Sequence, residues 1–134
     1  MDALSSQIGA NLPAGTMQFT LFVPSCDRNE QPIDQERWVQ EALEVFGCLF
    51  RGATAFPPGR GVWRDDQKGG KLVWEQPVMV VCYADPREVN KTTLPSIRSF
   101  LHRMGREARQ GEIGIVIDSD YYGISNYDNA EDQE

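Results

Sequence analysis

Residues 60–85, RGVWRDDQKGGKLVWEQPVMVVCYAD, decide the fold that we predict for this chain. Lys68-Gly69-Gly70 supplies the positive-φ residues that a tight turn needs, and runs rich in Val, Trp and Tyr flank it. A hairpin folded about Lys68 and Gly69 places Trp63 opposite Trp74, which is a favourable cross-strand pair. The stretch therefore predicts two antiparallel strands joined by a turn.

The other regular elements follow from hydrophobic periodicity. Alternation of apolar and polar residues predicts strands, and apolar residues spaced three or four apart predict amphipathic helices. Asp34 suits the N-cap of the first helix, and the prolines at 57 and 58 confine the second strand to a sheet edge. We expect strands at 17–24, 52–66, 71–85 and 112–118, and helices between Asp34 and Gly47 and between Thr93 and Gly111.

This order of elements, βαββαβ, predicts an α+β fold. With right-handed crossovers it gives a ferredoxin-like plait, an antiparallel sheet in the order 4-1-3-2 with both helices on one face. We expect one such domain over residues 16–125. It is preceded by a flexible arm at 1–15 and followed by an acidic disordered tail at 126–134.

The composition fits a small soluble protein. Of the 134 residues, 40% are hydrophobic and 25% are charged, and no apolar run approaches the length that spans a bilayer. The N-terminus lacks the basic and apolar regions of a secretory signal. Three cysteines without CxxC spacing are typical of free thiols in a reducing compartment. We therefore expect a cytoplasmic protein with no membrane contact.

The formal net charge of −7 belongs to the end of the chain. Six acidic residues and no basic residue follow position 117, while the segment 87–109 is basic. A basic helix and an acidic tail attract one another, so these two segments can shield each other. The sequence pI near 4.7 argues against a dedicated nucleic-acid-binding protein.

Three short motifs carry a resemblance to a known family. They are IDQERWVQ at 33–40, GRGVWRDD at 59–66, and a valine-rich strand ending in ADP at 84–86. Together they resemble a family of small bacterial ferredoxin-like proteins of unknown function, over about residues 17–118. The resemblance implies a fold and no catalytic residue.

One face of the predicted sheet is left open by the helices. Its centre is apolar and its margin is charged, and a monomer rarely leaves so continuous an apolar patch in water. The face is either a surface for self-association or ligands, or it is covered by the C-terminal segment with its tyrosines. We expect the other face of the hairpin, with Trp63, Leu72, Trp74, Val78 and Val80, to point toward the helices. A bulge at Pro77 would exchange the faces of the third strand. The binding candidates on this face are Phe22, Arg64, Glu75, Met79, Val81, Tyr83, Val116 and Asp118.

Basic residues line one side of the second predicted helix. Arg98, His102, Arg106 and Arg109 recur at helical spacing, so they form either a phosphate-binding stripe or a solvated face paired with the tail. His102 is the single histidine, which excludes a two-histidine zinc site within one chain. We expect no metal and no cofactor.

No motif in the sequence is a catalytic signature, so a role without catalysis is favoured. The first interpretation is a domain that acts by association through the open face, as a homodimer or as an accessory or regulatory subunit of another protein. The alternative is a small enzyme with an Arg/carboxylate cleft for an anionic small molecule, built from Arg60, Arg64, Glu75, Asp118 and Tyr83. A second alternative is nucleotide or RNA binding through the basic helix.

Overall fold

A computed structural model describes residues 3–12 and 16–130 of the chain. Its sheet has five strands in the order β2-β5-β1-β6-β7, and every neighbouring pair is antiparallel. The strands are β1 (Met17–Val23), β2 (Thr54–Ala55), β5 (Val78–Ala84), β6 (Ile113–Ile117) and β7 (Asp120–Ile124). The predicted α+β class is confirmed, and β7 is a strand that the sequence reading left out.

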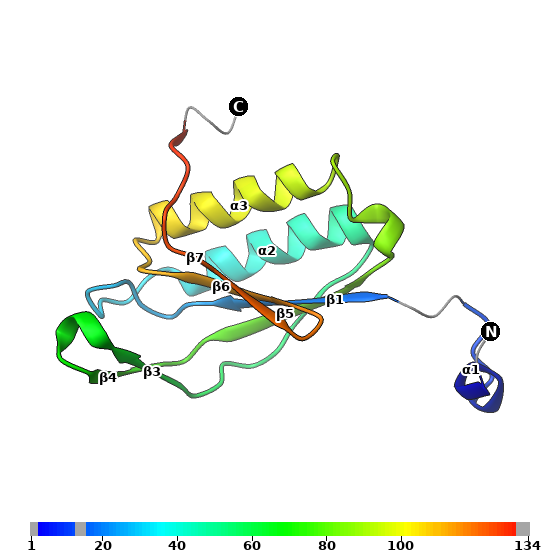
Figure 1. Cartoon of the computed structure of the whole chain (residues 1–134), viewed down its shortest axis with the longest axis horizontal. Coiled ribbons are helices and arrows are strands. Elements are labelled where there is room, and N and C mark those ends of the chain that lie inside the picture. The colour runs from blue at the N-terminus through cyan, green and yellow to red at the C-terminus, as the bar shows by residue number, and fades with distance from the viewer. Residues whose placement is uncertain (1–2, 13–15, 131–134) are drawn as a thin grey trace.

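The two long helices lie on the same side of the sheet, α2 (Gln35–Phe50) and α3 (Leu94–Glu107) (Figure 1). Asp34 caps α2 as predicted, because its side chain accepts a hydrogen bond from Arg37 N. The helix runs past Gly47, however, and ends at Phe50, and its C-cap residue Arg51 adopts the left-handed conformation at φ 74°. Short helical segments are α1 (Ala3–Ile8), η1 (Asp66–Lys68) and η2 (Pro86–Glu88).

The hairpin of 60–85 differs most from its prediction. Strands β3 (Gly61–Asp65) and β4 (Lys71–Glu75) form a separate two-stranded sheet. The extended segment is interrupted at Gln76-Pro77 before β5 begins. The turn is longer than predicted, because Asp65 caps the 3-10 turn η1 and both Gly69 and Gly70 have positive φ. The register therefore shifts by one residue.

This shift places the two tryptophans, which we expected on one face, on opposite faces of the hairpin. Trp63 pairs with Val73, and Trp74 pairs with Val62. Val73 is buried while both tryptophans are exposed, so the expectation that the tryptophans point toward the helices is wrong. On β5, by contrast, Val78 and Val80 do enter the core as predicted.

The chain after β2 follows the edge of β5 without pairing as a regular strand. Phe56 N donates to Met79 O and Gly59 N donates to Pro77 O. Pro57 and Pro58 have no N–H to donate, and at the edge of the sheet they interrupt no internal ladder.

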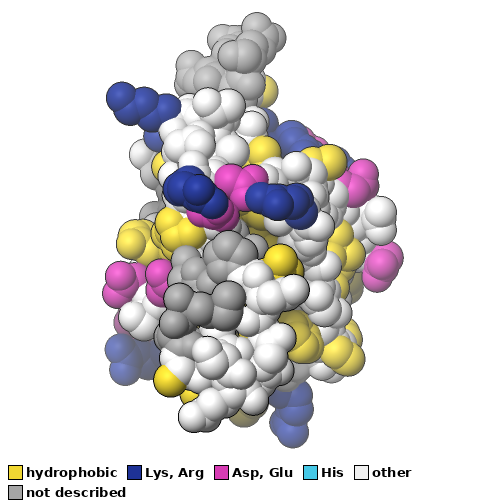
Figure 2. All heavy atoms as spheres, turned by 90° about the vertical axis from the view of Figure 1, so that its right-hand side faces the viewer, with side chains coloured by type: hydrophobic (Ala, Val, Ile, Leu, Met, Phe, Trp, Pro, Cys, Tyr) yellow, Lys and Arg dark blue, Asp and Glu magenta, His cyan; other side chains and the backbone are white. Residues whose placement is uncertain are grey.

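The end of the sheet where β1 begins and β5 finishes carries ion pairs. Arg87 Nη2 lies 2.7 Å from Asp85 Oδ2, and Arg51 pairs with Glu88. Figure 2 shows this end of the molecule, with basic and acidic side chains next to one another and hydrophobic side chains in small separate groups. The charged groups of these two ion pairs neutralise one another.

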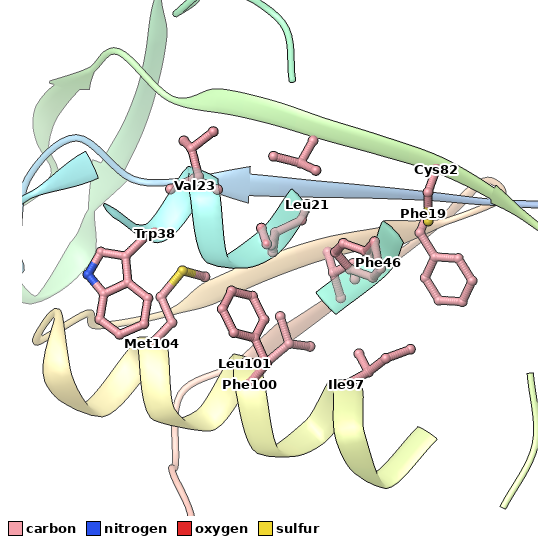
Figure 3. Packing of buried hydrophobic residues seen from close by; sticks show 14 of the residues in the cluster. Phe19, Leu21, Val23, Trp38, Phe46, Cys82, Ile97, Phe100, Leu101 and Met104 are labelled. Atoms are coloured by element: carbon pink, nitrogen blue, oxygen red, sulfur yellow. The ribbon is translucent and has the colours of Figure 1, made fainter. Parts of the chain in front are cut away.

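A single hydrophobic core fills the space between the sheet and the two helices (Figure 3). Phe19 stacks on Phe50 with ring centroids 5.5 Å apart, and Trp38 tilts against Phe100. Burial of large apolar side chains is the main stabilising contribution in a domain of this size. The remaining large core side chains are Leu21, Val23, Phe46, Ile97, Leu101, Met104, Ile113 and Ile115.

The C-terminal segment returns to the helices. Asp128 forms a salt bridge with Arg98, which agrees with the expected attraction between the acidic tail and the basic helix. Residues 126–130 are described, whereas residues 131–134 of the predicted tail, like 1–2 and 13–15 of the predicted arm, lie outside the described residues. The tyrosines of β7, Tyr121 and Tyr122, are exposed at the sheet edge.

Candidate active site

A pocket lies at the end of the sheet where β1 finishes and the hairpin begins. Its volume is about 470 Å³, large enough for a nucleoside-sized molecule. The segment after β1 forms one wall and the base of the hairpin forms the other. The lining residues are Ser25, Cys26, Glu30, Pro32, Arg60, Trp74, Glu75 and Gln76.

Hydrogen bonds between the two walls fix this arrangement. Gln76 N donates to Ser25 Oγ at 3.0 Å, so the residue before Pro77 is fastened to the residue after Pro24. Gln35 Nε2 bridges the carbonyls of Val23 and Gln76, at 3.2 and 2.9 Å. The shape of the pocket is therefore determined where the chain leaves β1 and where it leaves β4.

Glu75 is the central titratable group of the pocket. Burial raises the pKa of its carboxyl above the ordinary value, and the hydrogen bonds from Cys26 and Ser25 only partly offset this. Among the described residues no lysine or arginine forms an ion pair with Glu75. A half-buried carboxylate without a counter-cation favours the binding of a cation or the uptake of a proton.

Cys26 is the nearest partner of Glu75. Its thiol donates to Glu75 Oε1, with 3.7 Å between the sulfur and the oxygen. Burial and the adjacent carboxylate raise the pKa of Cys26, so the thiol stays protonated at neutral pH. A protonated thiol is a poor nucleophile, and Cys26 therefore serves as a hydrogen-bond donor to Glu75.

The outer wall of the pocket is aromatic and charged. Arg60 lies over the ring of Trp74, with its guanidinium carbon 5.8 Å from the ring centroid. Glu30 lies on the rim, where Lys71 Nζ approaches its Oε2 to 2.8 Å and helps to lower the pKa of the Glu30 carboxyl. An exposed indole beside a pocket offers a stacking surface to a planar base.

The structure separates the residues of the predicted Arg/carboxylate cleft. Glu75 and Arg60 both line the pocket, as the cleft requires. Arg64 instead forms an ion pair with Asp66 on the hairpin. Asp118 accepts a hydrogen bond from Gln18 N after β6, and Tyr83 lies at the far end of β5.

The other candidates of the open face lie in the central strands. Phe22 pairs with Met79, and Thr20 joins Val81 to Val116 across β1. Val81 is nearly buried, whereas Met79 and Tyr83 remain exposed. None of these residues lines the pocket around Glu75.

The predicted basic stripe on α3 is already engaged within the chain. His102 is 7% exposed, and its Nδ1 accepts a hydrogen bond from Asp128 N. Arg98 and Arg106 both contact Asp128, and Arg109 Nη2 lies 3.0 Å from Asp27 Oδ2. These contacts match the alternative in which the tail pairs with the helix, and they oppose a phosphate-binding stripe.

A metal site is not formed within residues 3–12 and 16–130, because no three of their His, Cys, Asp and Glu side chains converge. This part of the chain also has no helix that is long and apolar enough to cross a membrane. The thiols are free in the described structure, with Cys26 half-buried, Cys48 exposed and Cys82 buried.

A second pocket of about 490 Å³ lies near the other end of β5. It is shared between the loop after α2 and the exposed rings of Phe56 and Tyr83. It contains no carboxylate. The half-buried acid therefore distinguishes the pocket around Glu75.

Sequence reasoning missed most partners of Glu75. Ser25 and Gln76 are 51 residues apart in the sequence, and hydrophobic periodicity does not predict contacts at that separation. One signal was available, because a proline directly before Ser25 and another directly after Gln76 mark two strand ends at which polar residues can meet.

The fold resembles that of a phage SAM lyase. A solved structure of that enzyme in complex with S-methyl-5'-thioadenosine matches with a TM-score of 0.65 and 18% sequence identity, over 87% of this chain and 94% of the other. A phage SAM lyase in the apo state matches with a TM-score of 0.61, also at 18% identity, over 89% and 96%. No protein-family model and no curated protein sequence matches the chain.

This likeness corrects the first functional interpretation. An association domain without an enzymatic role was favoured because the sequence has no catalytic signature. The same fold, over nearly the same length, carries a lyase. The absence of a recognisable motif therefore did not justify excluding an enzyme, and the small-enzyme alternative is the better supported one. The resemblance to ferredoxin-like proteins of unknown function stays a prediction.

Proposed function

We propose that this chain is a small lyase that binds a sulfonium compound of the S-adenosylmethionine kind in the pocket around Glu75. The main support is the half-buried carboxylate of Glu75, which has no basic partner among the described residues and lies next to the exposed indole of Trp74. The fold shared with a phage SAM lyase adds support. The charge distribution in this pocket favours a cationic ligand over the anionic one expected from the sequence.

Each wall of the pocket suits one part of such a ligand. Trp74, with Arg60 against it, offers a face on which an adenine ring can stack. Glu75 offers negative charge at the place where a sulfonium would lie. Glu30 on the rim is already paired with Lys71, so Glu75 is the group that would balance the ligand's positive charge.

Glu75 would act as a base in this reaction. When the bond between sulfur and the amino-acid side chain breaks, both electrons go to sulfur and the positive charge disappears. A carboxylate that only attracted the sulfonium would stabilise the substrate more than the transition state. Its raised pKa suits removal of a proton from the carbon next to the one bound to sulfur, with the Cys26 thiol orienting the carboxylate. The electrons of that C–H bond would form a carbon–carbon double bond as the C–S bond breaks, so the products would be S-methyl-5'-thioadenosine and an unsaturated amino acid.

Paired ligands and one substitution test the proposal. S-Adenosylmethionine carries the sulfonium charge, and S-methyl-5'-thioadenosine lacks it. We expect Glu75→Gln to weaken calorimetric binding of the charged ligand by about tenfold while changing the neutral one about twofold or less. Formation of S-methyl-5'-thioadenosine, followed by chromatography, should fall by about a hundredfold or more.

Glu36→Gln is the matched control, since Glu36 is exposed on α2 and does not line the pocket. If Glu75→Gln weakens the binding of both ligands equally, Glu75 does not recognise the sulfonium charge. Unchanged turnover would remove its role as a base. A wild-type chain that binds neither ligand and forms no product would overturn the proposed function itself.

We also propose that a ferredoxin-like plait underlies the sheet. The support is that β6, β1, β5 and β2 follow one another in the order expected for its four strands, with α2 and α3 on one face. On this proposal, β7 and the separate hairpin are additions, and the hairpin is the addition that forms the pocket.

A further inference from the structure

The C-terminal segment docks on α3 at a place shaped for it. Gly105 is buried there, and the Tyr127 ring occupies the position that a side chain at residue 105 would need. The Tyr127 hydroxyl donates to the carbonyl of Gln110 at 2.9 Å. Tyr127 thus packs on the last turns of α3 and binds the backbone that follows them.

Asp128 fastens the same segment with charge. Its carboxylate accepts from Arg98 Nε at 2.7 Å and from Arg98 Nη2 at 2.9 Å, while Arg106 donates to its carbonyl. Asp128 N donates to His102 Nδ1 at 2.8 Å. Burial lowers the pKa of His102, so at neutral pH the imidazole is uncharged and can accept that hydrogen bond.

Gln110 connects this docked segment to the pocket. The residue is 7% exposed, and its Nε2 donates to Cys26 O and to Ala108 O, each at 2.9 Å. The side chain of Cys26 in turn donates to Glu75. One buried amide therefore stands between the C-terminal segment and the residue that holds the pocket carboxylate.

Two further contacts fasten the same loop to the end of α3. Arg28 N donates to Arg109 O at 3.0 Å, and Arg109 forms an ion pair with Asp27. Arg109 has a φ of 51°, which turns the chain so that Gln110 enters the interior. The loop that carries Cys26 is therefore built on the turn that Tyr127 covers.

We propose that Gln110 is a positioning residue of the pocket and that the docked Tyr127–Asp128 segment holds it in place. This inference rests on the proposed function for its catalytic consequence only. The docked segment fixes the turn after α3, the turn fixes the Gln110 amide, and the amide fixes the Cys26 backbone and hence the orientation of the Glu75 carboxylate. Misplacement of a reacting group by about 1 Å can slow a reaction about a hundredfold.

Two substitutions of graded severity test the proposal. Gln110→Met keeps the volume and removes the amide, and Tyr127→Phe removes one hydroxyl and leaves the ring in place. Tyr122→Phe is the control, because Tyr122 is exposed on β7 and lies outside this chain of contacts. We expect kcat for S-adenosylmethionine to fall about tenfold to a hundredfold in Gln110→Met and about threefold in Tyr127→Phe, with KM changing less than kcat.

Two readouts do not depend on any activity. The first is the titration of the Glu75 carboxyl by carbon NMR, which should move toward its ordinary value in Gln110→Met as water reaches the loosened loop. The second is hydrogen exchange of the Gln76 amide, which should speed up because its acceptor, Ser25 Oγ, lies in that loop. Both should change in the same direction, and less, in Tyr127→Phe.

The outcomes separate the two proposals. If the wild-type protein neither binds nor cleaves the sulfonium but both substitutions alter the Glu75 titration and the Gln76 exchange, the positioning role stands and the proposed reaction fails. If both readouts match the wild type in folded Tyr127→Phe and Gln110→Met, the positioning role is overturned. Equal changes in Tyr122→Phe would overturn it as well.

Discussion

Val73 and Trp74 are neighbours on β4, yet Val73 is 2% exposed and Trp74 is 60% exposed. The alternation of a strand explains the contrast, because successive side chains point to opposite faces. Only a register in which Val73 faces inward leaves the indole of Trp74 at the pocket. The pocket's aromatic wall therefore depends on the hairpin register that the sequence reading placed one residue away.

Trp74 should contribute binding energy through stacking. We expect Trp74→Ala to weaken the binding of S-methyl-5'-thioadenosine by about tenfold, since stacking of a base on an aromatic side chain is worth roughly 1–3 kcal/mol. Calorimetry measures the change. Trp63→Ala is the control on the same hairpin, because Trp63 is also exposed but does not line the pocket. Equal loss in both variants would place the ligand elsewhere.

Gly105 should tolerate no side chain. A methyl group there overlaps the ring of Tyr127, and we expect Gly105→Ala to lower the free energy of unfolding by about 1–3 kcal/mol. Urea denaturation measures it. Gly47→Ala on α2 is the opposite case, because a Cβ there meets nothing within 4 Å and should stabilise the helix by about 0.5–1 kcal/mol. Destabilisation by both would indicate a general intolerance of helical alanine.

Asp128 should make the protein more stable at neutral pH than in acid. Hydrogen bonds from Arg98 lower the pKa of its carboxyl below the unfolded value. A carboxyl with a lowered pKa stabilises the fold above its unfolded pKa, and this contribution is lost as the pH falls through the folded value. Asp128→Asn should therefore destabilise the protein at pH 7 and differ little from the wild type at about pH 2.

Urea midpoints at the two pH values test this expectation. Asp120→Asn serves as the control, since Asp120 is an exposed acid on β7 that lies outside the contacts of Asp128. If the urea midpoints of the wild type and Asp128→Asn differ by the same amount at both pH values, the ion pair with Arg98 does not act through the charge of the carboxylate.

We propose, apart from the function, that two copies of the chain pair through the open face of the sheet. Met79 and Tyr83 are exposed there beside Phe22 and Val81. We expect a homodimer in sedimentation experiments at micromolar concentration, and we expect Met79→Lys to weaken it. Leu94→Lys is the control, since Leu94 is exposed at the start of α3, on the helix side of the sheet. A monomer at every concentration would leave this prediction without support.

The sequence predicted those parts of the fold that depend on local pattern. Phe19, Leu21 and Val23 alternate on β1 and all three are buried, and Asp34 caps α2. Both follow from periodicity and from the hydrogen bonding of a helix terminus. The turn after Asp65 did not follow, because the capping aspartate lengthens a loop that the two glycines alone suggest is tight.

The sequence predicted some residues of the candidate site, but not which residues the fold brings together there. Glu75 and Arg60 were identified as polar groups of a cleft, and both line the pocket. Arg64 was grouped with them because alternation put it on the same face as Glu75. The observed register pairs it with Leu72 on the opposite face, and its ion pair is with Asp66. The link from Gln110 to Cys26 joins residues 84 positions apart, which only the folded chain brings together.

The break at Gln76-Pro77 has a consequence for how such a protein can diverge. The five-stranded sheet keeps its own ladders whatever the hairpin does, because β3 and β4 pair only with each other. Insertions at the hairpin tip, or exchanges at its exposed positions, can thus accumulate with little effect on the core. The hairpin's share of the pocket, which includes Arg60 and Trp74, can therefore vary apart from the five-stranded sheet, so new specificities are accessible to this chain by small steps.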